Sequence, residues 1–308
     1  MLTAVGATFV FDALARDVDE LHAGRPAPAR TSAVAGLRPV ATDYVPSDLE
    51  PPLSPGMAAE DPFAATDLDC SDLEDCTFGD VASDEVAVLF GDSHAAHWIP
   101  ALDGTGDALG LRVHALVVPG CTPFVTDDGA PNPRQCHRDL DRAWRALADL
   151  RPDILVLSGR HIELRRRDPT GWRAGIDAAL RRSPARSTIV LSETPTATDL
   201  VPYCLSEHLH DVRPCEPAHD RELADANAEL SALTTGQDAA LADLTSLLCD
   251  DERCPVIVGN TLVYRDATHV TTAFVTSRVE HFADLIRGAL RDVSIDGQRS
   301  GRRARASR

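Results

Sequence analysis

Three residues of this sequence have side chains of the kind that transfer or hydrolyse an ester. Ser93 stands in the segment Gly91-Asp-Ser-His94, and the segment Asp266-Ala-Thr-His269 follows near the other end of the chain. Ester chemistry of this kind needs a nucleophile, a base that takes its proton and a group that orients the base. The spacing of Asp266 and His269 allows the carboxylate to reach the imidazole and fix its tautomer. The pattern predicts Ser93 as nucleophile, His269 as base and Asp266 as the orienting residue.

Each of these residues also has a structural alternative. A serine after a strand and before a helix is a common helix N-cap, and His269 has the position of an ordinary residue at a helix start. We favour catalysis because the two segments occur together, at opposite ends of one predicted domain. Asp92 is expected to be a structural turn residue. His94 and His97 either touch substrate or serve in packing and capping, and the histidine spacing predicts no metal site.

The strand that precedes Ser93 is predicted from a continuous apolar run, Val86-Ala-Val-Leu-Phe90. Such a run is typical of a parallel strand buried on both faces. Its end at Gly91 puts Ser93 at the carboxyl edge of the sheet, where open α/β sheets bind ligands. Further strands are predicted over 111–118, 153–157 and 187–192, and helices over 95–109, 137–150, 170–182, 219–234 and 271–290. Because strands alternate with helices, we expect an α/β fold with a doubly wound, mainly parallel sheet and helices on both faces.

The chain divides by composition into three parts. Most of residues 1–66 are rich in proline, alanine and acidic residues, and we expect a linker or a wrapping segment there. Residues 67–292 are expected to form the catalytic domain, and the arginine-rich residues 293–308 a disordered tail. Within the domain, Gly259-Asn260 separates two apolar runs, which predicts a tight hairpin.

The formal net charge of −18 narrows the range of partners. An acidic protein repels phosphate backbones and anionic lipid surfaces, so we expect neither nucleic acid nor a membrane surface as a partner. A hydrophobic content of 44% is ordinary for a globular chain. We also expect no membrane-spanning segment, because no apolar run reaches about 18 residues.

The eight cysteines form pairs that are local in sequence: Cys70/Cys76, Cys121/Cys136, Cys204/Cys215 and Cys249/Cys254. Local pairs on predicted loops are typical of disulfides in an oxidising compartment. Zinc binding is the alternative, but no pair has CxxC spacing and no histidines cluster beside the pairs. We therefore expect disulfides and a location outside the cytoplasm. The export route stays open, because the apolar run in residues 1–16 has no basic residue before it and Asp12 interrupts it.

These motifs together resemble those of the SGNH hydrolases, a superfamily of serine esterases whose sequences open with a GDS block and close with DxxH. More narrowly, the chain is similar to the SGNH domain at the C-terminus of membrane acyltransferase-3 proteins. The similarity covers roughly residues 68–290 and rests on Cys76-Thr-Phe-Gly-Asp80, Gly91-Asp-Ser-His-Ala-Ala-His-Trp98 with Pro100-Ala-Leu102, Gly120-Cys121, Leu248-Cys-Asp-Asp-Glu-Arg-Cys-Pro255 and Tyr264-Arg-Asp-Ala-Thr-His269.

The resemblance has implications for both site and function. Acyltransferase-3 proteins that carry this domain O-acetylate cell-surface polysaccharides, and their SGNH domain lies outside the membrane. The resemblance implies Ser93, His269 and Asp266 in the roles given above, and the backbone N–H of Ser93 as an oxyanion donor. It implies no cofactor, a glycan substrate, and a membrane acyltransferase-3 module as the partner that supplies acyl groups.

One block departs from the superfamily. The third block is Gly-x-Asn after the third strand, with the asparagine donating to the oxyanion, whereas this sequence has Gly159-Arg160-His161. Losing an oxyanion donor costs about 100- to 1,000-fold in rate unless another donor replaces it. His161 and, by its place after the second strand, Gly120 are candidate oxyanion donors. His94 and Arg160 are candidates for substrate contacts.

We therefore expect an extracytoplasmic enzyme that transfers an acyl group, most simply acetyl, to or from hydroxyls of cell-surface glycans through an acyl-enzyme on Ser93. A carbohydrate O-acetyl esterase with the same triad is the close alternative. A catalytically weak glycan-binding accessory domain is a third interpretation, because the block-three asparagine is missing.

Overall fold

The computed structural model describes residues 21–28, 38–53, 61, 70, 73, 76–124, 133–218 and 221–306, with side chains as far as residue 293. The chain forms two compact units. Unit 1 comprises residues 1–64, 194–219 and 246–277, and unit 2 comprises residues 65–193, 220–245 and 278–308. The range 67–292, which the sequence analysis assigns to one catalytic domain, therefore contributes to both units.

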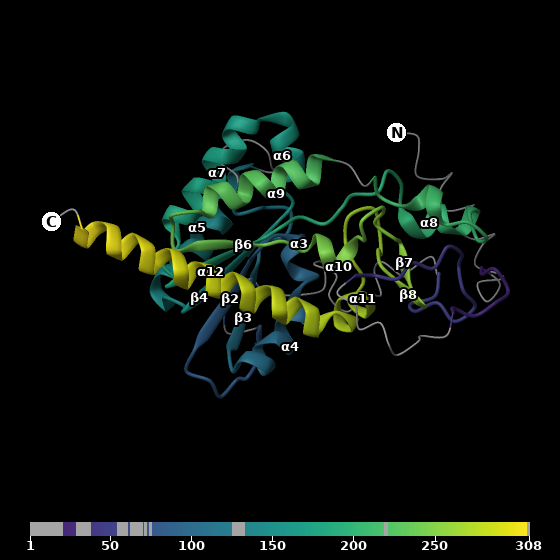
Figure 1. Ribbon diagram of the computed structural model, residues 1–308, viewed down its shortest axis with the longest axis horizontal. Helices are drawn as coiled ribbons and strands as arrows, with labels where there is room; N and C mark the ends of the chain where they lie inside the picture. Colours follow the sequence, from purple (N-terminus) through teal and green to yellow (C-terminus); the bar gives the residue numbers. More distant parts are fainter. Residues whose placement is uncertain are drawn as a thin grey trace. The chain divides into compact units, whose positions relative to one another are not determined.

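Unit 2 contains the central sheet (Figure 1). Its strands lie in the order β1-β3-β2-β4-β5-β6. β1 runs antiparallel to β3, and the other neighbours are parallel. The expected doubly wound, mainly parallel sheet is confirmed. The strands are β1 (Thr77–Gly79), β2 (Val86–Gly91), β3 (Arg112–Val117), β4 (Ile154–Ser158), β5 (Ser187–Leu191) and β6 (Ala239–Ala242).

The strand order reverses beside β2. The chain continues from β2 outward to β3 on one side, and then returns to place β4 on the other side of β2. In open α/β sheets, the carboxyl edge at such a reversal of strand order is the usual place for a ligand, because the two loops diverge there. The loops that follow β2 and β4 therefore lie where a ligand is expected.

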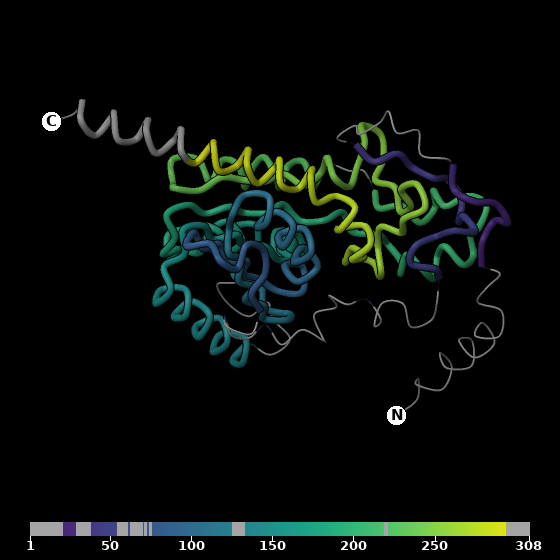
Figure 2. Tube along the Cα trace, turned by 90° about the horizontal axis from the view of Figure 1, so that it is seen from below, coloured from purple at the N-terminus to yellow at the C-terminus, as the bar shows by residue number. Residues whose placement is uncertain are grey.

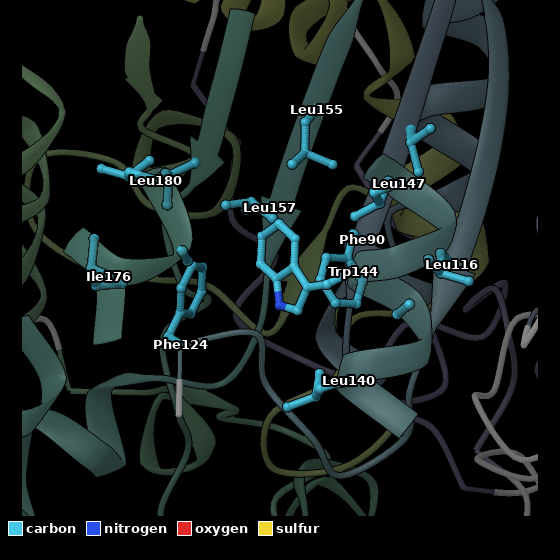
Figure 3. Packing of buried hydrophobic residues seen from close by; sticks show 14 of the residues in the cluster. Phe90, Leu116, Phe124, Leu140, Trp144, Leu147, Leu155, Leu157, Ile176 and Leu180 are labelled. Carbon is cyan, nitrogen blue, oxygen red and sulfur yellow. The ribbon is translucent and has the colours of Figure 1, made fainter. Parts of the chain in front are cut away.

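One face of the sheet is covered by α5 (Pro133–Leu150), α7 (Pro169–Arg182) and α9 (Arg221–Thr234). Their apolar side chains form one buried cluster with side chains of β2, β3, β4 and β5. Trp144 of α5 lies at the centre of this cluster (Figure 3), where its ring meets Phe90 edge to face with centroids 5.0 Å apart. Burial of such aromatic side chains against a sheet supplies much of the hydrophobic stabilisation of a domain this size.

The opposite face is covered by α4 (Ile99–Leu109) and α12 (Val279–Ala306), which lie side by side (Figure 1). Gly104 permits their close approach, since a Cβ at that position would meet the Val279 side chain. Trp98 stacks on Phe282 of α12 with ring centroids 5.4 Å apart. This contact joins the segment just after Ser93 to the last helix of the chain.

Several helix predictions need correction. The segment 95–109 is two helices, α3 (Ser93–Ala96) and α4, and the segment 271–290 is α11 (Thr272–Ser277) and α12. α12 continues to Ala306 and so runs through residues 293–306, where the sequence analysis expects a disordered tail. Its arginines and alanines favour a helix once the preceding turns are packed. Residues 307–308 lie outside the described part of the chain.

The sequence analysis also missed some short elements. These are β1, β6, α6 (Ile162–Arg167), α10 (Thr245–Leu248), and, between the predicted strand 187–192 and the predicted helix 219–234, α8 (Val201–Glu207) and the 3₁₀ helix Arg213–Cys215. β6 has the sequence Ala-Ala-Leu-Ala, which favours a helix by intrinsic propensity. It is a strand because it pairs with β5 at the end of the sheet.

Unit 1 is built around the predicted hairpin, which is confirmed as β7 (Ile257–Val258) and β8 (Thr261–Leu262). Gly259 in its turn has φ 61°, a conformation that favours glycine. Residues 38–53 lie along this hairpin (Figure 2), with isolated bridges from Ala41 to Val258 and from Glu50 to Thr261. Residues 38–53 of the N-terminal segment are therefore part of the fold of unit 1.

All four expected disulfides are present, Cys70–Cys76 and Cys121–Cys136 in unit 2 and Cys204–Cys215 and Cys249–Cys254 in unit 1. Every cysteine is thus oxidised in a pair within one unit. Over the described ranges, no helix is long and apolar enough to cross a membrane. Nor does the described part of the chain hold a group of three or more histidine, cysteine or acidic side chains suited to a metal ion.

Candidate active site

Ser93 lies directly after the central strand of unit 2, as predicted. β2 ends at Gly91, where a Cβ would collide with the carbonyl oxygen of Ser158 at the end of β4. The flanking residues Asp92 and His94 are buried, whereas Ser93 is partly exposed. The backbone turn therefore presents one side chain, the serine hydroxyl, at the carboxyl edge of the sheet.

Asp92 organises this turn. Its Oδ1 accepts a hydrogen bond from the His94 N–H at 2.8 Å, so Asp92 is the N-cap of α3. Its Oδ2 accepts from the Arg160 N–H at 2.9 Å, which ties the loop after β4 to the loop after β2. Burial acts to raise the pKa of Asp92, but the His94 side chain and these backbone N–H groups outweigh it and hold the pKa below its usual value. The expectation of a structural turn residue is confirmed, and the N-cap alternative for Ser93 is wrong.

The loop after β4 contains Gly159-Arg160-His161, the segment that differs from the Gly-x-Asn of the third block. Gly91 of β2 pairs in register with Ser158 of β4, so the residues that follow each strand lie next to one another. Gly159 packs where a Cβ would stand 2.5 Å from Thr122 Oγ1 and 3.1 Å from Asp92 Oδ2. The side chain of Arg160 is exposed, while its backbone N–H is bound to Asp92.

His161 is completely buried beside this turn. Its Nδ1 accepts a hydrogen bond from the indole Nε1–H of Trp172 at 3.2 Å, and the edge of Phe124 meets its ring with centroids 5.5 Å apart. Burial lowers the pKa of His161 to about 4 against the charge of Asp92, which acts to raise it. Nε2 is buried without a hydrogen-bond partner among the described residues.

Glu193, which follows β5, holds the backbone of the same loop. Its Oε2 accepts from the N–H groups of His161 and Ile162, both at 2.5 Å. Burial raises the pKa of Glu193 to about 7, although the two backbone hydrogen bonds act to lower it. Sequence reasoning missed Glu193. The rule that placed Ser93, that polar residues follow buried strands at the carboxyl edge, also applies to the segment Ser192-Glu193-Thr194 after the fourth predicted strand.

The remaining predicted site residues of unit 2 have varied positions. Gly120 lies in an exposed turn with φ 71°, and no atom stands within 4 Å of its Cβ direction. The residue of that loop that reaches Gly159 is Thr122, which is buried. His94 is also buried, with Nδ1 3.6 Å from Asp92 Oδ1, and His97 packs edge-on against Trp98.

Asp266 and His269 lie together in unit 1. His269 Nδ1 is 2.7 Å from Asp266 Oδ2, and Asp266 Oδ1 accepts from the N–H groups of Thr268 and His269 at 2.7 and 2.8 Å. Burial acts to raise the pKa of Asp266, but the His269 side chain and these N–H groups hold it well below its usual value. Since an ionised carboxylate only accepts, Nδ1 of His269 is the donor, and in the neutral ring this is the tautomer with its lone pair at Nε2.

The loop that carries this pair is closed at both ends. Tyr264 and Val270 form an antiparallel bridge, and the Arg265 N–H donates to the His269 carbonyl at 3.0 Å. The buried side chains of Arg265 and Asp61 form an ion pair at 3.1 Å, and Asp61 also accepts from the Thr272 N–H at 2.8 Å. Asp61 belongs to the segment expected to be a linker or wrapping segment, and here it supports the loop of His269.

The family described as "SGNH domain (fused to AT3 domains)" matches residues 60–284. A search among curated proteins finds no significant match. Among solved structures, the periplasmic domain of a lipopolysaccharide acetyltransferase from Salmonella ser. Paratyphi A is similar at TM-score 0.55 and 15% identity, over 68% of this chain and 86% of that one.

Two esterases show weaker similarity. A carbohydrate acetylesterase from Sinorhizobium meliloti has TM-score 0.44 and 14% identity, over 66% of this chain and 99% of its own. An acetyl-xylooligosaccharide esterase from Geobacillus Stearmophilus has TM-score 0.39 and 13% identity, over 67% of this chain and 96% of its own. The family match spans most of the chain and includes both Ser93 and the Asp266–His269 pair. This chain therefore belongs to the family of SGNH domains that are fused to AT3 domains.

Proposed function

We propose that this protein transfers or hydrolyses O-acetyl groups on glycan hydroxyls through an acyl-enzyme on Ser93. The observation that carries the proposal is the hydrogen bond between Asp266 and His269, at 2.7 Å. A carboxylate on Nδ1 leaves the Nε2 lone pair as a base and stabilises the imidazolium that forms when this base takes a proton. Ser93 is the nucleophile that the family resemblance assigns to this base.

The proposed reaction has two balanced halves. In the first, His269 Nε2 takes the proton of the Ser93 hydroxyl while Oγ bonds to the ester carbonyl carbon. The tetrahedral oxyanion then collapses, the alcohol leaves with the proton from His269, and acetyl-Ser93 remains. In the second half, His269 deprotonates a water or a sugar hydroxyl, whose oxygen attacks the acetyl carbonyl. When this second tetrahedral intermediate collapses, the bond to Ser93 Oγ breaks and His269 returns the proton to Oγ. The product is acetic acid, which ionises to acetate, or an acetylated sugar. The same residues thus serve an esterase and a transferase.

The substrate class follows from the family. Fusion to AT3 domains and the fold of a lipopolysaccharide acetyltransferase periplasmic domain support an acetyl group and a glycan hydroxyl. A membrane acyltransferase-3 module is the proposed source of acetyl groups for transfer. An extracytoplasmic location agrees with the four disulfides, because oxidising compartments preserve such bonds.

Fluorophosphonate labelling tests the proposal, with mass spectrometry to locate the adduct and an aryl-acetate assay on the same samples. We expect the adduct on Ser93, and the loss of both labelling and turnover in Ser93→Ala. Ser83→Ala is the matched control, since Ser83 is a partly exposed serine of the same unit whose hydroxyl caps the Gly110 carbonyl at 2.6 Å. Absence of labelling in folded, oxidised protein would favour the glycan-binding accessory interpretation instead.

A further inference from the structure

The buried contact between Trp172 and His161 takes no part in the reaction proposed for Ser93, His269 and Asp266. Both rings are almost fully buried, at 1% and 0% exposure. The indole N–H of Trp172 points at His161 Nδ1 across 3.2 Å, and the two rings lie nearly parallel with centroids 5.9 Å apart. Trp172 belongs to α7, which packs in the same hydrophobic cluster as Phe124 and Ile176 (Figure 3). The donor is thus held in place by the core of unit 2.

This contact determines where the proton of His161 lies. The indole nitrogen of tryptophan can only donate, so Nδ1 of His161 must accept and carries no proton. A neutral imidazole whose Nδ1 accepts a hydrogen bond through its lone pair has its proton on Nε2. The pKa of His161, lowered to about 4 by burial, agrees with a neutral ring at physiological pH. His161 therefore has an N–H donor at Nε2, and this atom lacks a partner among the described residues.

The position of His161 in the sheet brings this donor near the Ser93 turn. His161 follows β4 by three residues, as Ser93 follows β2 by two, and the ends of these strands are paired through Gly91 and Ser158. The Ser158 hydroxyl donates to the His94 carbonyl at 3.2 Å, which joins the two loops again. The charges of Asp92 and His94 also act on the pKa of His161. His161 therefore lies beside the Ser93 turn, at the edge of the sheet where the strand order reverses.

Glu193 fixes the backbone beneath the ring. Its carboxylate oxygen accepts from the N–H groups of His161 and Ile162 together, so the loop cannot rotate without losing both bonds. A buried N–H without a partner is destabilising and rare in folded proteins, so the retention of this donor points to a partner that is present at some step of the reaction. An oxyanion is such a partner, and it exists only during reaction.

We propose that Trp172 is a positioning residue that holds His161 as the Nε2–H tautomer, so that this N–H stabilises the oxyanion formed on attack by Ser93. The inference rests on the proposed function and adds the means by which a histidine replaces the asparagine of the third block. A neutral N–H donor can replace an amide N–H donor, whereas the opposite tautomer would present a lone pair to the oxyanion and repel it. The tautomer therefore decides whether His161 helps or hinders the reaction.

Steady-state kinetics of Trp172→Phe test this role. The variant keeps an aromatic ring and loses the N–H, so we expect kcat for an aryl acetate to fall about 10- to 100-fold with KM within about twofold. Trp144→Phe is the matched control, because Trp144 is also buried in the same cluster and bears no hydrogen bond to a histidine among the described residues. We expect its kcat within about twofold of the unchanged protein.

The conservative replacement His161→Gln distinguishes a positioning role of Trp172 from a purely structural one. In His161→Gln, the side-chain amide N–H takes the place of Nε2–H and needs no tautomer. We expect Trp172→Phe to lower kcat less than about threefold in this background, against its larger effect with His161 present. Equal effects of Trp172→Phe in both backgrounds would overturn the proposal, because the loss would then be structural.

Nitrogen-15 NMR of the histidine side chains reads the tautomer of His161 in the unchanged protein. With His161→Gln to assign the signals, the unchanged protein should show His161 protonated at Nε2 and unprotonated at Nδ1. The reverse tautomer would overturn the inference. If Ser93→Ala retains turnover, the proposed function fails, whatever the tautomer. If Ser93 is essential while Trp172→Phe has unchanged kcat, only the further inference fails.

Discussion

Nδ1 of His269 lies 2.7 Å from Oδ2 of Asp266, and this contact gives His269 the tautomer opposite to that of His161. The Asp266 carboxylate accepts a hydrogen bond from the Nδ1–H of His269, whereas the indole N–H of Trp172 donates a hydrogen bond to Nδ1 of His161. One histidine is thereby left with a lone pair at Nε2 and the other with a proton there. A base and an oxyanion donor require this difference, since the first must take a proton and the second must offer one.

Replacement of Asp266 by Asn should impair the base without unfolding the loop. The amide oxygen can still accept from the Thr268 and His269 N–H groups, which are 2.7 and 2.8 Å from Oδ1. The amide nitrogen would donate to His269 Nδ1 and force the proton onto Nε2, the wrong tautomer for a base. We expect kcat for an aryl acetate to fall about 100- to 10,000-fold. An unchanged rate in the folded variant would remove Asp266 from the mechanism.

Glu193→Gln should change how stability depends on pH. The folded chain raises the pKa of Glu193 from 4.5 to about 7, so between these values it binds more protons than the unfolded chain. The contribution of Glu193 to the free energy of unfolding therefore falls as the pH rises through this window. Urea unfolding at about pH 4.5, 6 and 8 measures it. We expect the stability of the unchanged protein relative to Glu193→Gln to decline with pH, and a pH-independent difference would contradict the assignment.

Gly91→Ala should destabilise unit 2 and disturb the Ser93 turn. The added methyl group would collide with the Ser158 carbonyl oxygen, which is backbone and cannot rotate away. We expect a loss of about 1–3 kcal/mol or more in the free energy of unfolding, together with reduced labelling of Ser93. Gly288→Ala is the control, because no atom lies within 4 Å of that Cβ direction in α12. There the gain in helix propensity should raise stability by up to about 1 kcal/mol. Equal effects of the two substitutions would contradict the close approach of β2 and β4.

The elements that depend on short stretches of sequence are predictable from the sequence. A run such as Val86–Phe90 has enough apolar surface to be buried on both faces whichever strands flank it. The cysteine pairs are close in sequence, with separations between 5 and 15 residues, so short loops bring them together. The spacing of Asp266 and His269 likewise places their side chains in contact within one loop.

Contacts between distant segments could be decided only by tertiary structure. The Asp61–Arg265 ion pair joins residues 204 positions apart, and neither residue has a sequence pattern that signals the other. β6 became a strand through pairing with β5, against the helix propensity of its alanines. For such elements, the energy of pairing and burial outweighs local preference.

The same division applies to the candidate site. Local sequence determined Ser93 at a strand end, the Asp266–His269 pair and the replacement of the third-block asparagine by His161. Tertiary structure decided the tautomer of His161, because the donor comes from Trp172 on a later helix and the backbone anchor comes from Glu193 after another strand. A tautomer depends on which donor or acceptor faces each ring nitrogen, and that is known only when the sheet and its helices have packed.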